Sequence, residues 1–78
     1  MLKNTRRFKF SVIVEKDKDG YFAFCPELQG CYSQGKTYEE VLGNIQDAVK
    51  LHLEDRIRGK EEIPERQSVS LSTVEVAV

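Results

Sequence analysis

Apolar and polar residues alternate over residues 8–15, which predicts a first β-strand. The segment Asp17-Lys18-Asp19-Gly20 favours a tight turn, because glycine tolerates positive φ and aspartate side chains bond nearby backbone. Residues 21–25 then form the return strand of a hairpin, and residues 31–34 form a short third strand after a turn at Pro26. One face of the first strand holds Phe8, Phe10, Val12 and Val14, and we assign Ile13, Tyr21, Ala23 and Cys25 to the other face of the sheet.

Apolar residues at spacings of three and four predict one long helix after these strands. The Thr37 hydroxyl can accept from the Glu40 amide while the Glu40 carboxylate reaches back to the Thr37 amide, which marks the start. Gly59 marks the end, at about Arg58. Gly43 costs about 1 kcal/mol relative to alanine, so it either permits close approach of another backbone or is simply tolerated. The apolar stripe contains Val41, Leu42, Ile45, Ala48, Val49, His52 and Leu53.

Residues 68–78 predict a last strand, because they are rich in β-branched residues and carry one charge, Glu75. Their apolar parity changes between Leu71 and Val74, which a bulge there would explain. An unpaired strand of this composition would aggregate, so it must pair with its own sheet or with another chain. The predicted architecture is a single α+β domain over residues 1–78, β-β-β-α-β, with one long helix on one face of an antiparallel-rich sheet.

A single helix covers only one face of such a sheet, whereas apolar residues are predicted on both faces. The second face therefore requires a binding partner that covers it. We expect a homo-dimer or larger oligomer, or another partner, that binds through the uncovered face or the terminal strand.

Composition is typical of a small globular protein: 78 residues, 40% apolar and 32% charged. The longest apolar run, residues 21–25, is far too short for a membrane span, and we expect a cytoplasmic protein. The net charge of −1 hides an asymmetry. Residues 1–18 hold six Lys or Arg against two acids, and residues 19–55 hold seven acids against two bases. This distribution favours self-association or a basic partner over a phosphate backbone.

No phosphate-binding, serine-hydrolase or zinc-protease motif is present in the sequence. Cys25, Cys31 and His52 are too few for a zinc site, so we interpret them as core or core-edge residues. The segment beginning at Asp17 lacks the ligand spacing of a calcium loop. We therefore expect no catalytic residue, cofactor or metal.

Two other functions stay open. A metal-dependent nuclease would use Glu15, Glu40 and Glu75, provided that these acids converge. A solitary oligomeric module would bind RNA or a small ligand through its basic N-terminal strand, including Arg6 and Arg7, and its RNA binding would depend strongly on salt.

An ordered series of short motifs occupies residues 8–58, about two thirds of the chain. They are Asp19-Gly20-Tyr21, Pro26-Glu27-Leu28, Gly30-Cys31, Ser33-Gln34-Gly35 and Thr37-Tyr38-Glu39-Glu40, followed by Asn44 and Ala48. This series resembles the HicB antitoxin family of bacterial toxin–antitoxin systems, from whose pattern Gln29 and Lys36 depart. The resemblance implies a reduced RNase H-like fold without catalytic acids, and an antitoxin that masks the active site of HicA, a small basic RNA-cleaving toxin.

The resemblance also implies an interface. Charge complementarity between the acidic stretch and a basic toxin would speed encounter. We expect the side chains of Tyr21, Glu27, Leu28 and Tyr32 to contact the partner. Many family members are oligomers, and many add a C-terminal segment that binds operator DNA. Only about 20 residues follow the helix here, and they favour a strand, so we do not expect DNA binding from this chain.

Overall fold

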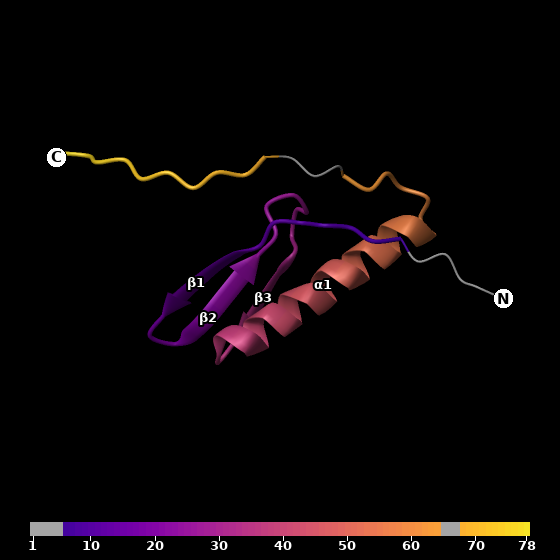
Figure 1. The fold of residues 1–78 in the computed structure, drawn as a ribbon, viewed down its shortest axis with the longest axis horizontal. Helices are drawn as coiled ribbons and strands as arrows, with labels where there is room; N and C mark the ends of the chain where they lie inside the picture. The colour runs from indigo at the N-terminus through magenta and orange to yellow at the C-terminus, as the bar shows by residue number, and fades with distance from the viewer. Residues whose placement is uncertain (1–5, 65–67) are drawn as a thin grey trace.

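Three antiparallel strands and one long helix make up the fold, as Figure 1 shows. The computed structural model describes residues 6–64 and 68–78. The strands are β1 (Ile13–Asp17), β2 (Gly20–Phe24) and β3 (Tyr32–Gly35), in the spatial order β1-β2-β3, and the helix is α1 (Tyr38–Arg58). This arrangement confirms the predicted α+β class, with an antiparallel sheet and one helix on one face.

The β1–β2 hairpin requires glycine at the first residue of β2, directly after the two-residue turn. Gly20 has a φ of +136°, which side-chain-bearing residues rarely adopt, and a Cβ there would lie 2.9 Å from the Gly35 carbonyl oxygen. The Asp19 amide donates to the Asp17 carboxylate at 2.8 Å, which stabilises the turn that the sequence predicted.

The hairpin register corrects the predicted division of the sheet into two faces. Val14 lies opposite Ala23, and Ile13 lies opposite Phe24. Residues directly opposite each other share a face, so Ala23 joins Val14 on the helix side, which we call the inner face. Ala23 is 0% exposed, so its assignment to the uncovered face was wrong. The same correction moves Tyr21 and Cys25 to the inner face, and it leaves Ile13, Phe22 and Phe24 on the other side.

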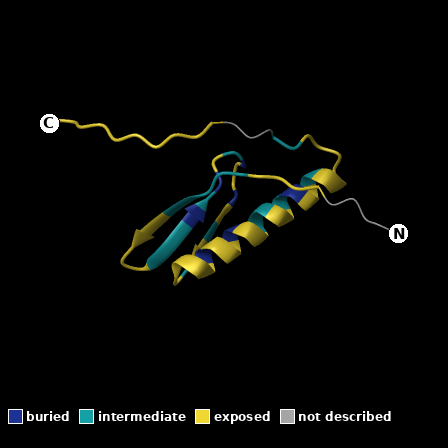
Figure 2. Ribbon diagram, viewed as in Figure 1, coloured by how far each residue is buried: buried dark blue, intermediate teal, exposed yellow. Residues whose placement is uncertain are grey.

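The core lies between the inner face and α1, as the buried residues in Figure 2 show. Phe10, Val12 and Val14 pack against it, which confirms the predicted face of the first strand. Its core residues are Ala23, Cys25, Leu28, Cys31, Val41, Ile45 and Leu53.

The first strand begins at Ile13 instead of Phe8, and its neighbour explains why. Ile13 is already opposite Phe24, the last residue of β2. Beyond that point the Cys25 amide donates to the Cys31 carbonyl at 3.0 Å, and Pro26 has no amide to offer. Residues 8–12 therefore approach the core without a strand partner within the described chain.

The helix begins where predicted, with one difference in its capping bonds. The Thr37 hydroxyl accepts from the Glu40 amide at 3.0 Å. The Glu40 carboxylate accepts from the Lys36 amide at 2.9 Å, and not from the Thr37 amide as expected. Close approach of backbones occurs at Gly35, where a Cβ would lie 2.6 Å from the Val41 nitrogen. Gly43, by contrast, is exposed, and a methyl group added there would meet nothing within 4 Å, so the close-approach explanation for this glycine is wrong.

The helix ends at Arg58, with Gly59 as its C-cap. Gly59 has an ordinary φ of −82°, and the left-handed position belongs to Lys60, with a φ of 57°. The glycine therefore lies one residue before the place where its conformational freedom would be used. Two amides close this turn: Lys60 donates to the Ile57 carbonyl at 3.1 Å and Glu61 to the Arg56 carbonyl at 2.8 Å.

Residues 68–78, which we call the tail, form no strand in the single chain. Figure 1 shows the tail, in yellow, extending past the sheet to the C-terminus without joining the sheet. The predicted fifth element is thus extended but unpaired, and its apolar side chains are open to solvent, with Leu71 93% and Val76 73% exposed. Among the described residues no helix has the apolar length that a bilayer span requires.

Candidate protein-binding surface

The sheet face opposite α1, which we call the outer face, is formed by two cross-strand rows. The first row runs from Ile13 through Phe24 to Tyr32, and the second from Glu15 through Phe22 to Gln34. Side chains alternate along each strand, so both rows project away from the helix. The outer face therefore consists of Ile13, Glu15, Phe22, Phe24, Tyr32 and Gln34.

Three aromatic rings occupy the centre of the outer face. The ring centroids of Phe22 and Phe24 are 6.1 Å apart, and those of Phe22 and Tyr32 are 5.9 Å apart in a stacked arrangement. The two phenylalanines are half-buried, while Tyr32 is 62% exposed. Contiguous exposed aromatic surface of this kind marks interaction sites, because rigid rings provide large contact area at low entropic cost.

The border of the outer face is acidic. Glu15 and Asp17 are exposed and share its side of β1 by strand alternation. The neighbouring base, Lys16, belongs to the inner side, where its Nζ lies 5.9 Å from the centre of the Tyr21 ring. An aromatic centre beside two carboxylates suits a basic protein partner better than a phosphate backbone.

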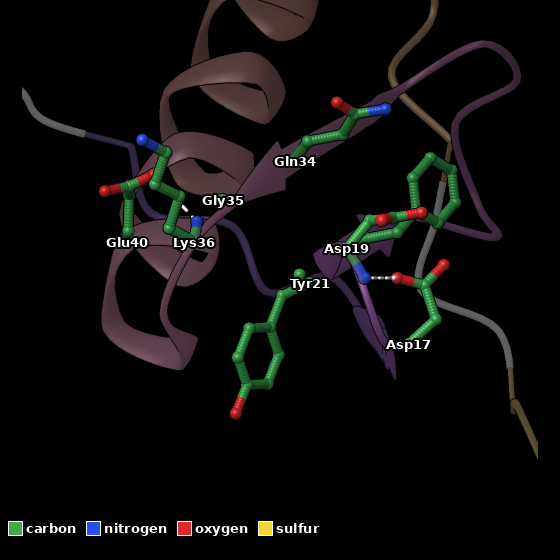
Figure 3. Close-up of a pocket in the computed structure, with 9 residues that line it drawn as sticks. Asp17, Asp19, Tyr21, Gln34, Gly35, Lys36 and Glu40 are labelled. Carbon is green, nitrogen blue, oxygen red and sulfur yellow. Dashed lines mark hydrogen bonds between the residues drawn. The ribbon is translucent and has the colours of Figure 1, made fainter.

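The acidic border continues into a hollow between the hairpin and the start of α1 (Figure 3). This open hollow has a volume of about 480 Å³. Two of its carboxylates already accept backbone amides, Asp17 from Asp19 and Glu40 from Lys36. Tyr21, which lines the hollow, meets Tyr38 edge to face, with ring centroids 6.2 Å apart. Its lining includes Asp17, Asp19, Tyr21, Gln34, Gly35, Lys36 and Glu40.

The four predicted contact residues lie in different parts of the molecule. Tyr32 lies on the outer face, whereas the half-buried Tyr21 belongs to the inner face and lines the hollow. Glu27 lies in the β2–β3 turn, where its carboxylate accepts from the Ser11 amide at 2.6 Å. Leu28 is 1% exposed in the core, so its side chain is not available for contact in this conformation. The position of Leu28 in a turn did not reveal from the sequence that its side chain points into the core.

Sequence reasoning missed Phe22 and Phe24 as surface residues. Their shared parity on one strand was visible, but the side on which they lie depends on the hairpin register. The signal that would have found them is the two-residue turn at Lys18 and Asp19, which fixes the pairing of Val14 with Ala23.

The carboxylates of the nuclease alternative do not meet. Glu15 lies on β1, Glu40 lies in the first turn of α1, and Glu75 lies in the unpaired tail. Within residues 6–64 and 68–78, no group of three His, Cys, Asp or Glu side chains is placed to hold a metal ion. A two-metal mechanism needs such convergence, so the geometry gives this alternative no support.

The cysteines and the histidine lie in or beside the core. Cys25 and Cys31 are free and buried, and burial raises the pKa of both thiols, with a smaller contribution to Cys31 from the neighbouring Cys25. His52 is half-buried, and its Nδ1 atom is buried without a hydrogen-bond partner among the described residues. These positions agree with the structural roles expected from the sequence.

Comparison with known proteins points in one direction. The family model described as "HicB_like antitoxin of bacterial toxin-antitoxin system" matches residues 10–76. The chain is similar to a UPF0150 protein of Helicobacter pylori strain J99, with 58% identity over 45 residues, or 58% of this chain and 62% of the relative. It therefore spans less than two thirds of that protein's length.

Two further relatives are matched over more of their length. A UPF0150 protein of Synechocystis is 41% identical over 63 residues, which cover 80% of each chain. A UPF0150 protein of Thermotoga maritima is 32% identical over 77 residues, which cover 96% of this chain and 97% of the relative. No solved structure matches the chain significantly.

Proposed function

The chain belongs to the HicB-like antitoxins of bacterial toxin–antitoxin systems, and from this premise we propose that it neutralises a HicA-type, RNA-cleaving toxin by binding over the toxin's active site. In this proposal the chain is a binding protein and not an enzyme. The observation that carries the proposal is the outer face, with its aromatic centre and acidic border.

Each part of the outer face has a separate role in such a complex. A surface that binds RNA is basic, so Glu15 and Asp17 would attract it and raise the rate of encounter. Phe22, Phe24 and Tyr32 would then be buried against the toxin and supply most of the affinity. The bound antitoxin would exclude RNA both by occupying its site and by neutralising its positive charge. Tyr21 and Glu27 lie off this face and would contribute only at its rim.

The remaining parts of the proposal follow from family membership. A toxin that cleaves RNA meets its substrate in the cytoplasm, so we place the antitoxin there. The RNase H-like order of elements, without the catalytic acids, belongs to the same proposal. Self-association is also part of this proposal, and the unpaired tail would mediate it.

The test is binding to the product of an adjacent reading frame that encodes a small basic protein. We expect the two proteins to co-purify, and we expect Tyr32→Ala to raise the dissociation constant about thirtyfold, a value typical of an aromatic hot spot. Ile57→Ala is the matched control, because Ile57 is 47% exposed near the C-terminal end of α1 and lines no hollow that contains an outer-face residue. Titration calorimetry with a catalytically inactive toxin measures both variants.

Three outcomes would contradict the proposal. They are the lack of any toxin-like neighbour, failure of the two proteins to co-purify, and equal effects of the two substitutions. The RNA-binding alternative predicts a different result. It requires salt-dependent RNA binding by the isolated chain, lost when Arg6 and Arg7, both exposed, are changed to alanine.

A further inference from the structure

An open apolar groove, which we call the helix groove, lies between α1 and the segment that precedes β1. Its volume is about 890 Å³. It is on the inner side of the sheet, so it is separate from the proposed toxin-binding face. The apolar side chains that line it include Phe8, Phe10, Val12, Ile45, Val49 and Leu53.

The helix groove lies beside a sheet edge that has no partner. Within the described residues β1 pairs with β2 alone, so its other edge is open. Residues 8–12 extend this edge along the groove without strand pairing. Open edges and adjacent apolar hollows together accept an added strand, because the edge supplies backbone hydrogen bonds and the hollow receives alternate side chains.

The tail has the chemistry that such an added strand needs. Val74, Val76 and Val78 share one parity, so in an extended conformation all three point to the same side. Glu75 is the single charge in residues 68–78, and it has the opposite parity, where it would face away from the groove. The charged residues that line the groove are Arg6, Lys9, Lys50 and Glu54, and their net positive charge would favour the approach of a tail whose one charge is Glu75.

The tail of the same chain does not occupy this groove. Ile63, after the helix, packs partly against the core, whereas the tail extends past the sheet as a separate segment and does not lie in the groove (Figure 1). The molecule reaches 60 Å in its longest dimension as a result. A tail that is extended, apolar and unpaired in the single chain is suited to exchange between two copies.

We propose that residues 74–78 of one copy add as a strand beside residues 8–12 of a second copy, with Val74, Val76 and Val78 in the helix groove. The exchange is reciprocal, so it closes a two-fold symmetric dimer and leaves no groove or tail unpaired. Two exchanged tails bury a surface on the order of the ~1,200–2,000 Å² that stable interfaces need. The outer faces of both copies stay free for toxin.

The first test uses the isolated chain without toxin, so its result is independent of the antitoxin proposal. We expect a dimer by sedimentation equilibrium, and we expect Val76→Lys to raise the dimer dissociation constant about tenfold or more. Ala77→Lys places the same charge on the opposite side of the tail and should leave the dissociation constant within about twofold. A monomeric parent chain, or equal effects of the two lysines, would overturn the proposal. Both changes lie in an exposed segment, so the fold is preserved.

The second test separates exchange between copies from pairing within one chain. A Val12→Cys variant and a Val76→Cys variant are mixed and treated with a short bis-maleimide. Exchange predicts a covalent dimer that contains one chain of each variant. Leu51→Cys replaces Val12→Cys in the control mixture and should give at least about fivefold less product, because Leu51 lies outside the groove. A cross-link that forms only within a Val12→Cys/Val76→Cys double variant, or equal yields in both mixtures, would refute exchange.

Discussion

The inner and outer faces of the sheet are built from the same three strands but differ in what approaches them. The inner face carries large side chains such as Val14 and Tyr21, but it has glycine at position 35, where a Cβ would lie 2.6 Å from the Val41 nitrogen of α1. The outer face carries Phe22 and Phe24, where no helix covers them. The difference indicates that a close helix requires a residue without a side chain on one face, while the aromatic area of the other face is available for binding.

The largest expected effect tests why position 35 on the inner face must be glycine. Gly35→Ala would place a methyl group 2.6 Å from the Val41 nitrogen, in backbone that cannot yield as a side chain would. The helix must then move away from β3, and we expect a loss of about 3 kcal/mol in the free energy of unfolding, measured by urea denaturation. In so small a domain this is a large part of the total stability. A loss below about 0.5 kcal/mol would show that close helix packing does not explain the glycine at this position.

A second glycine provides the matched control with the opposite sign. Gly43 lies in the same helix that Gly35 contacts, but it is exposed and a methyl group there meets nothing within 4 Å. Gly43→Ala should therefore raise the free energy of unfolding by about 1 kcal/mol, through helix propensity alone. The melting temperature should rise by about 4–8 °C. If Gly43→Ala instead destabilised the chain, or weakened toxin binding, this part of α1 would itself contact another molecule, in addition to the outer face.

The two glycines also show what could be predicted from the sequence. The hairpin, the Thr37 cap and the helix end followed from local rules, because turn and cap chemistry act over a few residues. The role of Gly35 did not follow, since it depends on a helix placed against it by the whole fold. For the same reason the sequence could not decide between close approach and simple tolerance at Gly43, where a methyl group would meet nothing within 4 Å.

The candidate site was predictable only in part. The sequence correctly indicated an under-covered apolar face, because a single helix cannot cover two faces. It misassigned β2 to these faces, since a hairpin register is a pairing between strands and one residue of slip exchanges them. Leu28 shows the same limit in a turn. Its position led us to predict a contact with the partner, whereas its side chain is buried in the core.

The smallest expected effect concerns the thiols on the inner side. Burial raises the pKa of Cys25 and Cys31, so in the folded chain both stay protonated to higher pH than they do in the unfolded chain. The unfolded chain then releases protons first as the pH rises, and stability must fall. Their contribution is complete below the pKa of an ordinary thiol and is lost as the pH rises from there through the raised values of the folded chain. Urea unfolding between about pH 7 and 10 measures this decline, which we expect to be absent below about pH 8.

The same thiols allow the two faces to be compared within one experiment. Tyr32→Cys puts a third thiol on the outer face, at a position that is 62% exposed in the parent. Because the thiolate is the reactive form, this thiol should react with iodoacetamide at about the rate of a free cysteine, while Cys25 and Cys31 react only as the chain opens. Rapid modification of all three in the native chain would mean that α1 does not seal the inner face. Slow modification of the new thiol would mean that the outer face is already covered, and the natural candidate for that cover would be a second copy of the chain.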